Sequence, residues 1–183
     1  MFAPARIILA AALIAASSST ALAQFGGGSL RGVAAGLSAS TPVGSFDTDA
    51  QTGIGLAIHS GGPEVAGTWG LRSNFTFDRF AGKGVLDNVQ FIGGGFDFMH
   101  LSPHRWYQYA GVVLSSANYT YKAGAAAGTT RGRNGSNFGL TGGIGVNFGN
   151  EEGTQFFVEF AATTMFTGST NSNWFPARFG LRF

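Results

Sequence analysis

The chain has 183 residues, of which 11% are charged, 30 are glycine and none is cysteine. Soluble domains carry about 25% charged residues, so a surface in water would be unusually poor in charge. The formal net charge of +2 gives no reason to expect a nucleic-acid partner. The lack of cysteine excludes disulfides, thiolate metal sites and cysteine nucleophiles.

The first predicted element is a secretory signal peptide over residues 1–23. Arg6 precedes an apolar run over residues 7–16, and a serine-rich stretch then leads to an A-x-A motif that ends at Ala23. This order is typical of a cleaved signal peptide. A transmembrane helix is the alternative, but the run is shorter than the ~20 apolar residues that a bilayer helix needs. We therefore expect residues 24–183 to form one exported domain.

Eight stretches of that domain alternate apolar with small or polar side chains, which is the two-residue period of a β-strand. The third is the clearest, with Phe75 and Phe77 on one face and Arg72 and Asp78 on the other. Together the alternating stretches cover residues 30–40, 52–60, 67–78, 89–101, 106–121, 137–148, 154–166 and 173–183.

The fourth and fifth stretches are special cases. Phe91 and Phe96 have opposite parity across Gly93-Gly94-Gly95, and a β-bulge at these glycines would explain the change of face. The fifth stretch places Tyr107, Tyr109, Val113, Tyr119 and Tyr121 on one parity, which we assign to the outside of the domain.

The predicted connections alternate in length. Four are longer and polar, and three are tight. Long loops at one end and short turns at the other are the layout of an outer-membrane β-barrel with both termini on the periplasmic side. A closed barrel is also the one strand-built structure that satisfies every backbone group in a bilayer. The longer connections cover residues 41–51, 79–87, 122–136 and 167–172, and the tight ones cover 61–64, 102–105 and 149–153.

Aromatic side chains on the outward parity gather near both ends of the strands. Two aromatic girdles around an apolar band are what a membrane barrel requires. A lipocalin-like soluble barrel is the alternative, but it would bury its apolar side chains, and here the opposite face is crowded with glycine. The girdle towards the long connections holds Phe75, Phe77, Tyr119, Tyr121, Phe138, Phe166 and Phe175, and the girdle towards the tight turns holds Phe98, Tyr107, Tyr109, Phe148, Phe156, Phe179 and Phe183.

The last stretch ends on a bare aromatic residue, with Phe179, Leu181 and Phe183 on one face and Arg178 and Arg182 on the other. This end resembles the closing strand of bacterial outer-membrane barrels. The whole of residues 24–183 resembles, in pattern, the small eight-stranded proteins grouped around the OmpA transmembrane domain, OmpX and the opacity proteins. The resemblance implies an all-β, antiparallel, up-and-down transmembrane barrel, monomeric and located in the outer membrane. It also implies that the three apolar residues form the signal for the barrel-assembly machinery. No peptidoglycan-binding domain is expected after Phe183.

Charged side chains on the inward parity are the first candidate functional set. Six charged residues and His59 share this parity, and a buried charge needs a partner. We expect an ion network that fills the lumen, with Glu159 paired to Arg178 or Arg182 because their strands are neighbours. A narrow, porin-like ion channel is the alternative, although an eight-stranded barrel leaves little room for water. The expected network consists of Arg72, Asp78, Asp97, Glu159, Arg178 and Arg182.

Catalysis is the less favoured alternative, since some small outer-membrane barrels modify lipid A. Such a site needs a serine beside a histidine, and His59-Ser60 is the one adjacent pair. It lies at the tight-turn end, and the His-x-Ser-Asn pattern of the deacylases is missing. No catalytic residue, cofactor site or metal-ligand cluster is predicted.

The remaining candidate is the loop over residues 122–136, which contains Lys122, Arg131 and Arg133 and no acid. We expect the partners of the protein to be outer-membrane lipid and lipopolysaccharide. These three cations are candidate contacts with lipopolysaccharide phosphates or another anion. Host or environmental surface ligands of the long loops are a further alternative. The predicted role is structural or surface-interacting, without catalysis.

Overall fold

A computed structural model describes residues 33–183 apart from 66–68, 103–104, 125–133, 150–153 and 169. The predicted signal peptide therefore lies outside the described residues. Within the described part, no helix is long and apolar enough to cross a membrane.

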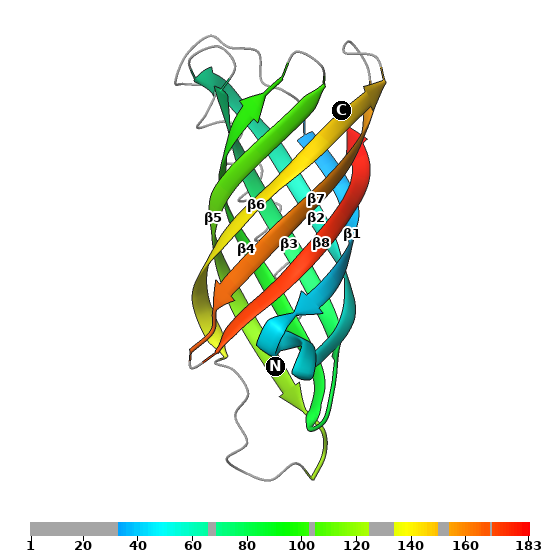
Figure 1. Cartoon of the computed structure of the whole chain (residues 1–183), viewed down its shortest axis with the longest axis vertical. Helices are drawn as coiled ribbons and strands as arrows, with labels where there is room; N and C mark the ends of the chain where they lie inside the picture. The colour runs from blue at the N-terminus through cyan, green and yellow to red at the C-terminus, as the bar shows by residue number, and fades with distance from the viewer. Residues whose placement is uncertain (1–32, 66–68, 103–104, 125–133, 150–153, 169) are drawn as a thin grey trace.

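The chain forms eight antiparallel strands, each paired with the next, and β1 pairs with β8 to close a barrel. This confirms the predicted fold class. Figure 1 shows the strands steeply tilted around the barrel, with a short helix, η1, at one end and the carboxy-terminus at the other. The elements are β1 (Val33–Val43), η1 (Gly44–Thr48), β2 (Ala50–Val65), β3 (Trp69–Gly82), β4 (Leu86–Leu101), β5 (Trp106–Tyr121), β6 (Gly135–Gly149), β7 (Gln155–Phe166) and β8 (Asn171–Arg182).

The polarity of the barrel wall is the reverse of that in a soluble protein, with apolar side chains on the outside and charged side chains on the inside. Apolar side chains such as Ile54 (73% exposed) and Phe160 (59% exposed) point outward, while Arg72 and Glu159 inside the barrel are 1% and 0% exposed. Strand register places the inward charges side by side, because Arg72 is the cross-strand partner of Asp97 and Glu159 that of Arg178. Alternation therefore gives the barrel an apolar exterior and places its charged side chains in the lumen.

The bulge suggested in the fourth strand is absent. β3 and β4 keep one unbroken register from the pair Trp69 and His100 to the pair Ala81 and Asn88. Phe91 is 3% exposed and Phe96 is 52% exposed. The two phenylalanines differ in parity because one fills the lumen and the other belongs to the outer face.

The outward assignment of the tyrosines on β5 is wrong. Tyr107, Tyr109 and Tyr119 are buried inside the barrel, and Tyr121 packs against the buried core from a partly buried position. Phenolic hydroxyls need hydrogen-bond partners when buried, and the lumen supplies them. The girdles consequently lose their tyrosines and consist of phenylalanines such as Phe138, joined by two exposed tryptophans near the tight turns, Trp69 and Trp106.

Two of the predicted long connections are shorter than expected. β3 continues to Gly82 and β4 begins at Leu86, so only residues 83–85 of the predicted loop 79–87 form a turn, with Gly84 in the left-handed region at φ 58°. Within the predicted loop 41–51, β1 runs on and η1 follows it. Polar residues such as Arg79 made these segments resemble loops, whereas buried Phe46 and Phe80 keep them in the fold.

The barrel lumen as candidate functional site

Glu159 on β7 is the centre of a buried ionic cluster. Its Oε1 accepts hydrogen bonds from Arg178 Nη1 (2.5 Å) and from the Tyr109 hydroxyl (2.7 Å). Its Oε2 accepts from Arg72 Nη1 (2.7 Å) and from the Tyr107 hydroxyl (3.2 Å). Four donors from three other strands thus converge on one carboxylate, and two of them are charged guanidinium groups.

Arg72 extends the cluster across the lumen. Its Nε donates to Asp97 Oδ2 at 2.8 Å, and its Cζ lies 4.2 Å from the centroid of the Tyr109 ring, within cation–π range. Two arginines and two acids are thereby neutralised in pairs. We call this group the ionic plug, defined as Arg72, Asp97, Glu159 and Arg178 with Tyr107 and Tyr109.

Glycines on β6 provide the space for the two tyrosines. Gly145 is the cross-strand partner of Tyr107 and Gly143 that of Tyr109. A β-carbon at Gly145 would collide with the Tyr107 ring, and one at Gly143 would lie 2.9 Å from the Tyr109 hydroxyl. The glycine-rich parity of β6 is therefore a packing requirement of the ionic plug.

The other predicted lumen residues lie outside these ion pairs. Asp78 is buried and accepts hydrogen bonds from Ser38 Oγ (3.1 Å) and Ser40 Oγ (2.9 Å). Arg182 lies on β8, two inward positions beyond Arg178. His59 packs beside Phe157, with ring centroids 5.8 Å apart.

A second plug, which the sequence analysis missed, fills the lumen at the end that carries η1. Phe46 of η1 reaches into the barrel and contacts Phe80 edge-on, with centroids 5.0 Å apart. Phe91 stacks on Trp174 at 4.8 Å, and Phe80 meets the same indole at 5.6 Å. We call these four residues the aromatic plug. Their inward parity was a usable signal for Phe91 and Trp174, but Phe46 and Phe80 fell in predicted loops.

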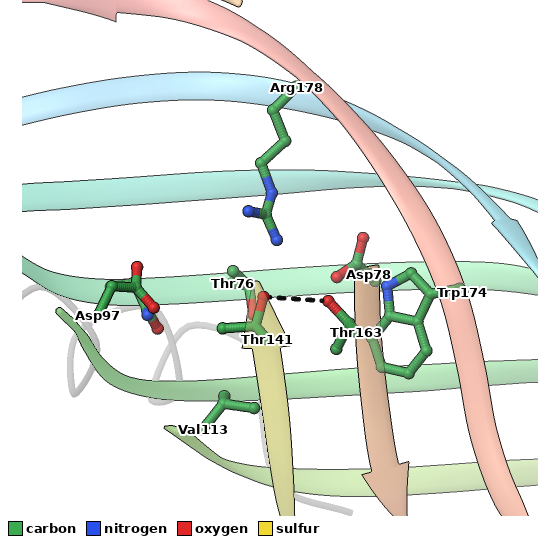
Figure 2. Close-up of a pocket in the computed structure, with 9 residues that line it drawn as sticks. Thr76, Asp78, Asp97, Val113, Thr141, Thr163, Trp174 and Arg178 are labelled. Carbon is green, nitrogen blue, oxygen red and sulfur yellow. Dashed lines mark hydrogen bonds between the residues drawn. The ribbon is translucent and has the colours of Figure 1, made fainter. Parts of the chain in front are cut away.

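A small chamber lies between the two plugs and has a volume of about 20 Å³. Figure 2 shows Arg178 entering it from one side, Asp97 and Trp174 on opposite flanks, and the hydrogen-bonded pair Thr141 and Thr163 between them. The chamber is lined by Asn74, Thr76, Asp78, Asp97, Val113, Thr141, Thr163, Trp174 and Arg178.

The predicted assembly and loop residues lie on the outside. Phe179 and Phe183 are exposed, Leu181 is partly buried, and the Phe183 backbone N–H donates to the Val33 carbonyl at 3.0 Å where the barrel closes. Lys122 donates through Nζ to the Gly84 carbonyl at 2.9 Å. The other two loop cations, Arg131 and Arg133, lie outside the described residues.

The His59-Ser60 pair does not form a catalytic arrangement. Successive residues of β2 point to opposite faces, so His59 is buried in the lumen and Ser60 lies on the outer side. Among the described residues no group of three or more His, Asp or Glu side chains could hold a metal ion.

Comparison with known proteins identifies structural relatives only. No protein-family model matches the chain, and no curated protein matches it in sequence. Among solved structures, the barrel is similar to Ail, the attachment invasion locus protein of Yersinia pestis, with 13% identity and a TM-score of 0.56 over 85% of this chain and 99% of that chain. Neisserial surface protein A aligns over 82% of this chain and 92% of its own, with 14% identity and a TM-score of 0.49. The likeness to Ail is one of fold.

Proposed function

We propose that the protein is a monomeric bacterial outer-membrane barrel, exported with residues 1–23 as a cleaved signal peptide. The inverted polarity of the wall carries this proposal. Monomeric soluble proteins rarely expose large contiguous apolar patches, yet here all eight strands carry exposed large apolar side chains on the outer face. Lipid is the solvent that suits such a surface. The fold shared with Ail, an outer-membrane barrel, supports the same location.

The role of the protein on this proposal is structural or surface-interacting, and the barrel does not conduct ions. The ionic plug and the aromatic plug occupy two successive levels of the lumen, and the chamber between them has a volume of only about 20 Å³. A hydrated ion would have to displace both plugs. Catalysis is not part of the proposal, because His59 and Ser60 lie on opposite faces of β2.

Lipopolysaccharide is the proposed lipid partner, and its proposed contact is a row of polar side chains on the outer face. Arg79, Gln90 and Asn118 are successive cross-strand partners on β3, β4 and β5 near the η1 end. Arg79 is exposed and has no ion-pair partner among the described residues. Guanidinium and amide donors suit phosphate oxygens. Lys122 lies near the same end, and Arg131 and Arg133, which follow it in the sequence outside the described residues, remain candidate contacts.

Location and conductance are tested together. We expect outer-membrane fractions to contain the protein beginning at Gln24, and planar bilayers containing the purified barrel to stay electrically silent. Recovery as a soluble periplasmic protein would refute the proposed location. Steady conductance that changes selectivity in Glu159→Gln would show that the ion network is a pathway and would favour the channel alternative.

The lipid contact is tested by thermal unfolding with and without added lipopolysaccharide. A ligand that binds the folded state raises its stability, so the midpoint should rise for the wild-type barrel and rise less for Arg79→Ser. Arg105→Ser is the matched control, because Arg105 is exposed in the β4–β5 turn at the opposite end. Equal rises in the two variants would contradict a contact at Arg79.

A further inference from the structure

Three buried polar atoms around the chamber lack hydrogen-bond partners among the described residues. They are Asn74 Oδ1, Asp97 Oδ1 and Trp174 Nε1, and their side chains all line the chamber. The three residues are 9%, 1% and 3% exposed, so bulk solvent does not satisfy these atoms. An unsatisfied buried polar group is unfavourable, because it has lost its hydrogen bonds to water and gained none in return. Three such groups at one cavity indicate that the cavity has an occupant.

The mixture of donors and acceptors identifies this occupant. Trp174 Nε1 can only donate, whereas the Asn74 and Asp97 oxygens can only accept. A metal cation would satisfy the oxygens but would be repelled by the indole N–H and by Arg178. An anion would accept from the indole N–H but would be repelled by the oxygens of Asn74 and Asp97. A water molecule accepts and donates at once. The chamber volume of about 20 Å³ is room for about one water, since the minimum is roughly 10–15 Å³.

We propose that the chamber binds one ordered water molecule, which accepts a hydrogen bond from Trp174 Nε1 and donates to Asn74 and Asp97. Trp174 belongs to the aromatic plug and Asp97 to the ionic plug, so this water joins the two plugs by hydrogen bonds. Arg178 also lines the site and is a second donor there, whereas both protons of the water are already donated to Asn74 and Asp97. The water exchanges with bulk solvent only when a plug opens. The inference thus deepens the sealed lumen of the proposed function.

The test is NMR of the refolded barrel in detergent micelles. The chain has three tryptophans, and Trp69 and Trp106 are exposed on the outer face. Their indole signals are assigned with Trp69→Phe and Trp106→Phe, which identifies Trp174 by elimination even if Trp174→Phe does not fold. We expect a cross-relaxation peak between the Trp174 indole proton and water, with the sign of a water that stays longer than the tumbling time of the barrel. No such peak at Trp174 would overturn the proposal.

A second variant examines what holds the water in place. Phe46→Ala removes the one member of the aromatic plug that comes from η1, so deuterium exchange of the Trp174 indole should become faster, while Trp69→Phe should leave it unchanged. An unchanged rate in Phe46→Ala would contradict a water trapped behind the aromatic plug. The NMR peak and the conductance test different claims. A barrel that conducts ions but still shows the peak at Trp174 would refute the sealed lumen and would still support the water site.

Discussion

Glu159→Gln should be among the most destabilising single substitutions in this barrel. Glutamine keeps one carbonyl oxygen and replaces the other carboxylate oxygen with an NH₂ group. Either Arg72 or Arg178, now 2.7 and 2.5 Å from a carboxylate oxygen, would then face a donor. The neutral group of two arginines and two acids would also gain an uncompensated positive charge. Breaking a buried ion pair by removing one partner costs about 3–5 kcal/mol.

Urea unfolding of the refolded barrel gives the free energy of unfolding for each variant. Asp47→Asn is the matched control, since the Asp47–Lys83 pair has a similar distance of 2.9 Å but lies on the surface, with the side chains 62% and 36% exposed. An exposed pair contributes about 0–1 kcal/mol. A loss of stability in Glu159→Gln no larger than that in Asp47→Asn would contradict a strong contribution from the buried ion pairs.

A double variant separates charge balance from simple loss of contacts. Glu159→Gln with Arg178→Gln restores the balance of charge in the ionic plug. The effects of substitutions on the free energy of unfolding are not additive for residues in one hydrogen-bonded network. The double variant should therefore lose less stability than the sum of the losses in the two single variants. Additive losses would show that the two side chains act independently, against the geometry of the cluster.

Two further predictions concern packing and assembly. Gly145→Ala should lower the free energy of unfolding by about 1–3 kcal/mol through overpacking against Tyr107. Gly142→Ala is the control on the outer face and should be close to wild type, because a β-carbon there meets its nearest atom at 3.4 Å. Equal free energies of unfolding for the two variants would show that the Tyr107 ring has room to move. Phe183→Asp should abolish the surface-exposed, heat-modifiable barrel in cells, while the purified chain should still refold in detergent. The reason is that the substitution removes the residue recognised by the assembly machinery, whereas the side chain of Phe183 contributes little buried surface to the fold. Normal surface exposure of the variant would contradict this role.

Local alternation explains why much of this fold can be predicted from sequence. The two-residue period of a strand is set by each residue's immediate neighbours, so Arg72, Asp97, Glu159 and Arg178 could be placed on one face without any tertiary information. Cross-strand pairing between consecutive strands also follows from an up-and-down barrel, and it gives the Glu159–Arg178 contact.

Tertiary structure alone decided which face of β5 points inward. Both parities of β5 are apolar enough for lipid, since one carries Val112 and Leu114 and the other carries the tyrosines. The tyrosines face the lumen because their hydroxyls find hydrogen-bond partners there, such as Glu159 on another strand. Barrel closure likewise brings Arg72 of β3 to Glu159 of β7, although these strands are not neighbours. Phe46 is buried against Phe80 because η1 lies at that end of the barrel (Figure 1). Such contacts depend on the curvature of the closed wall, which no local sequence pattern encodes.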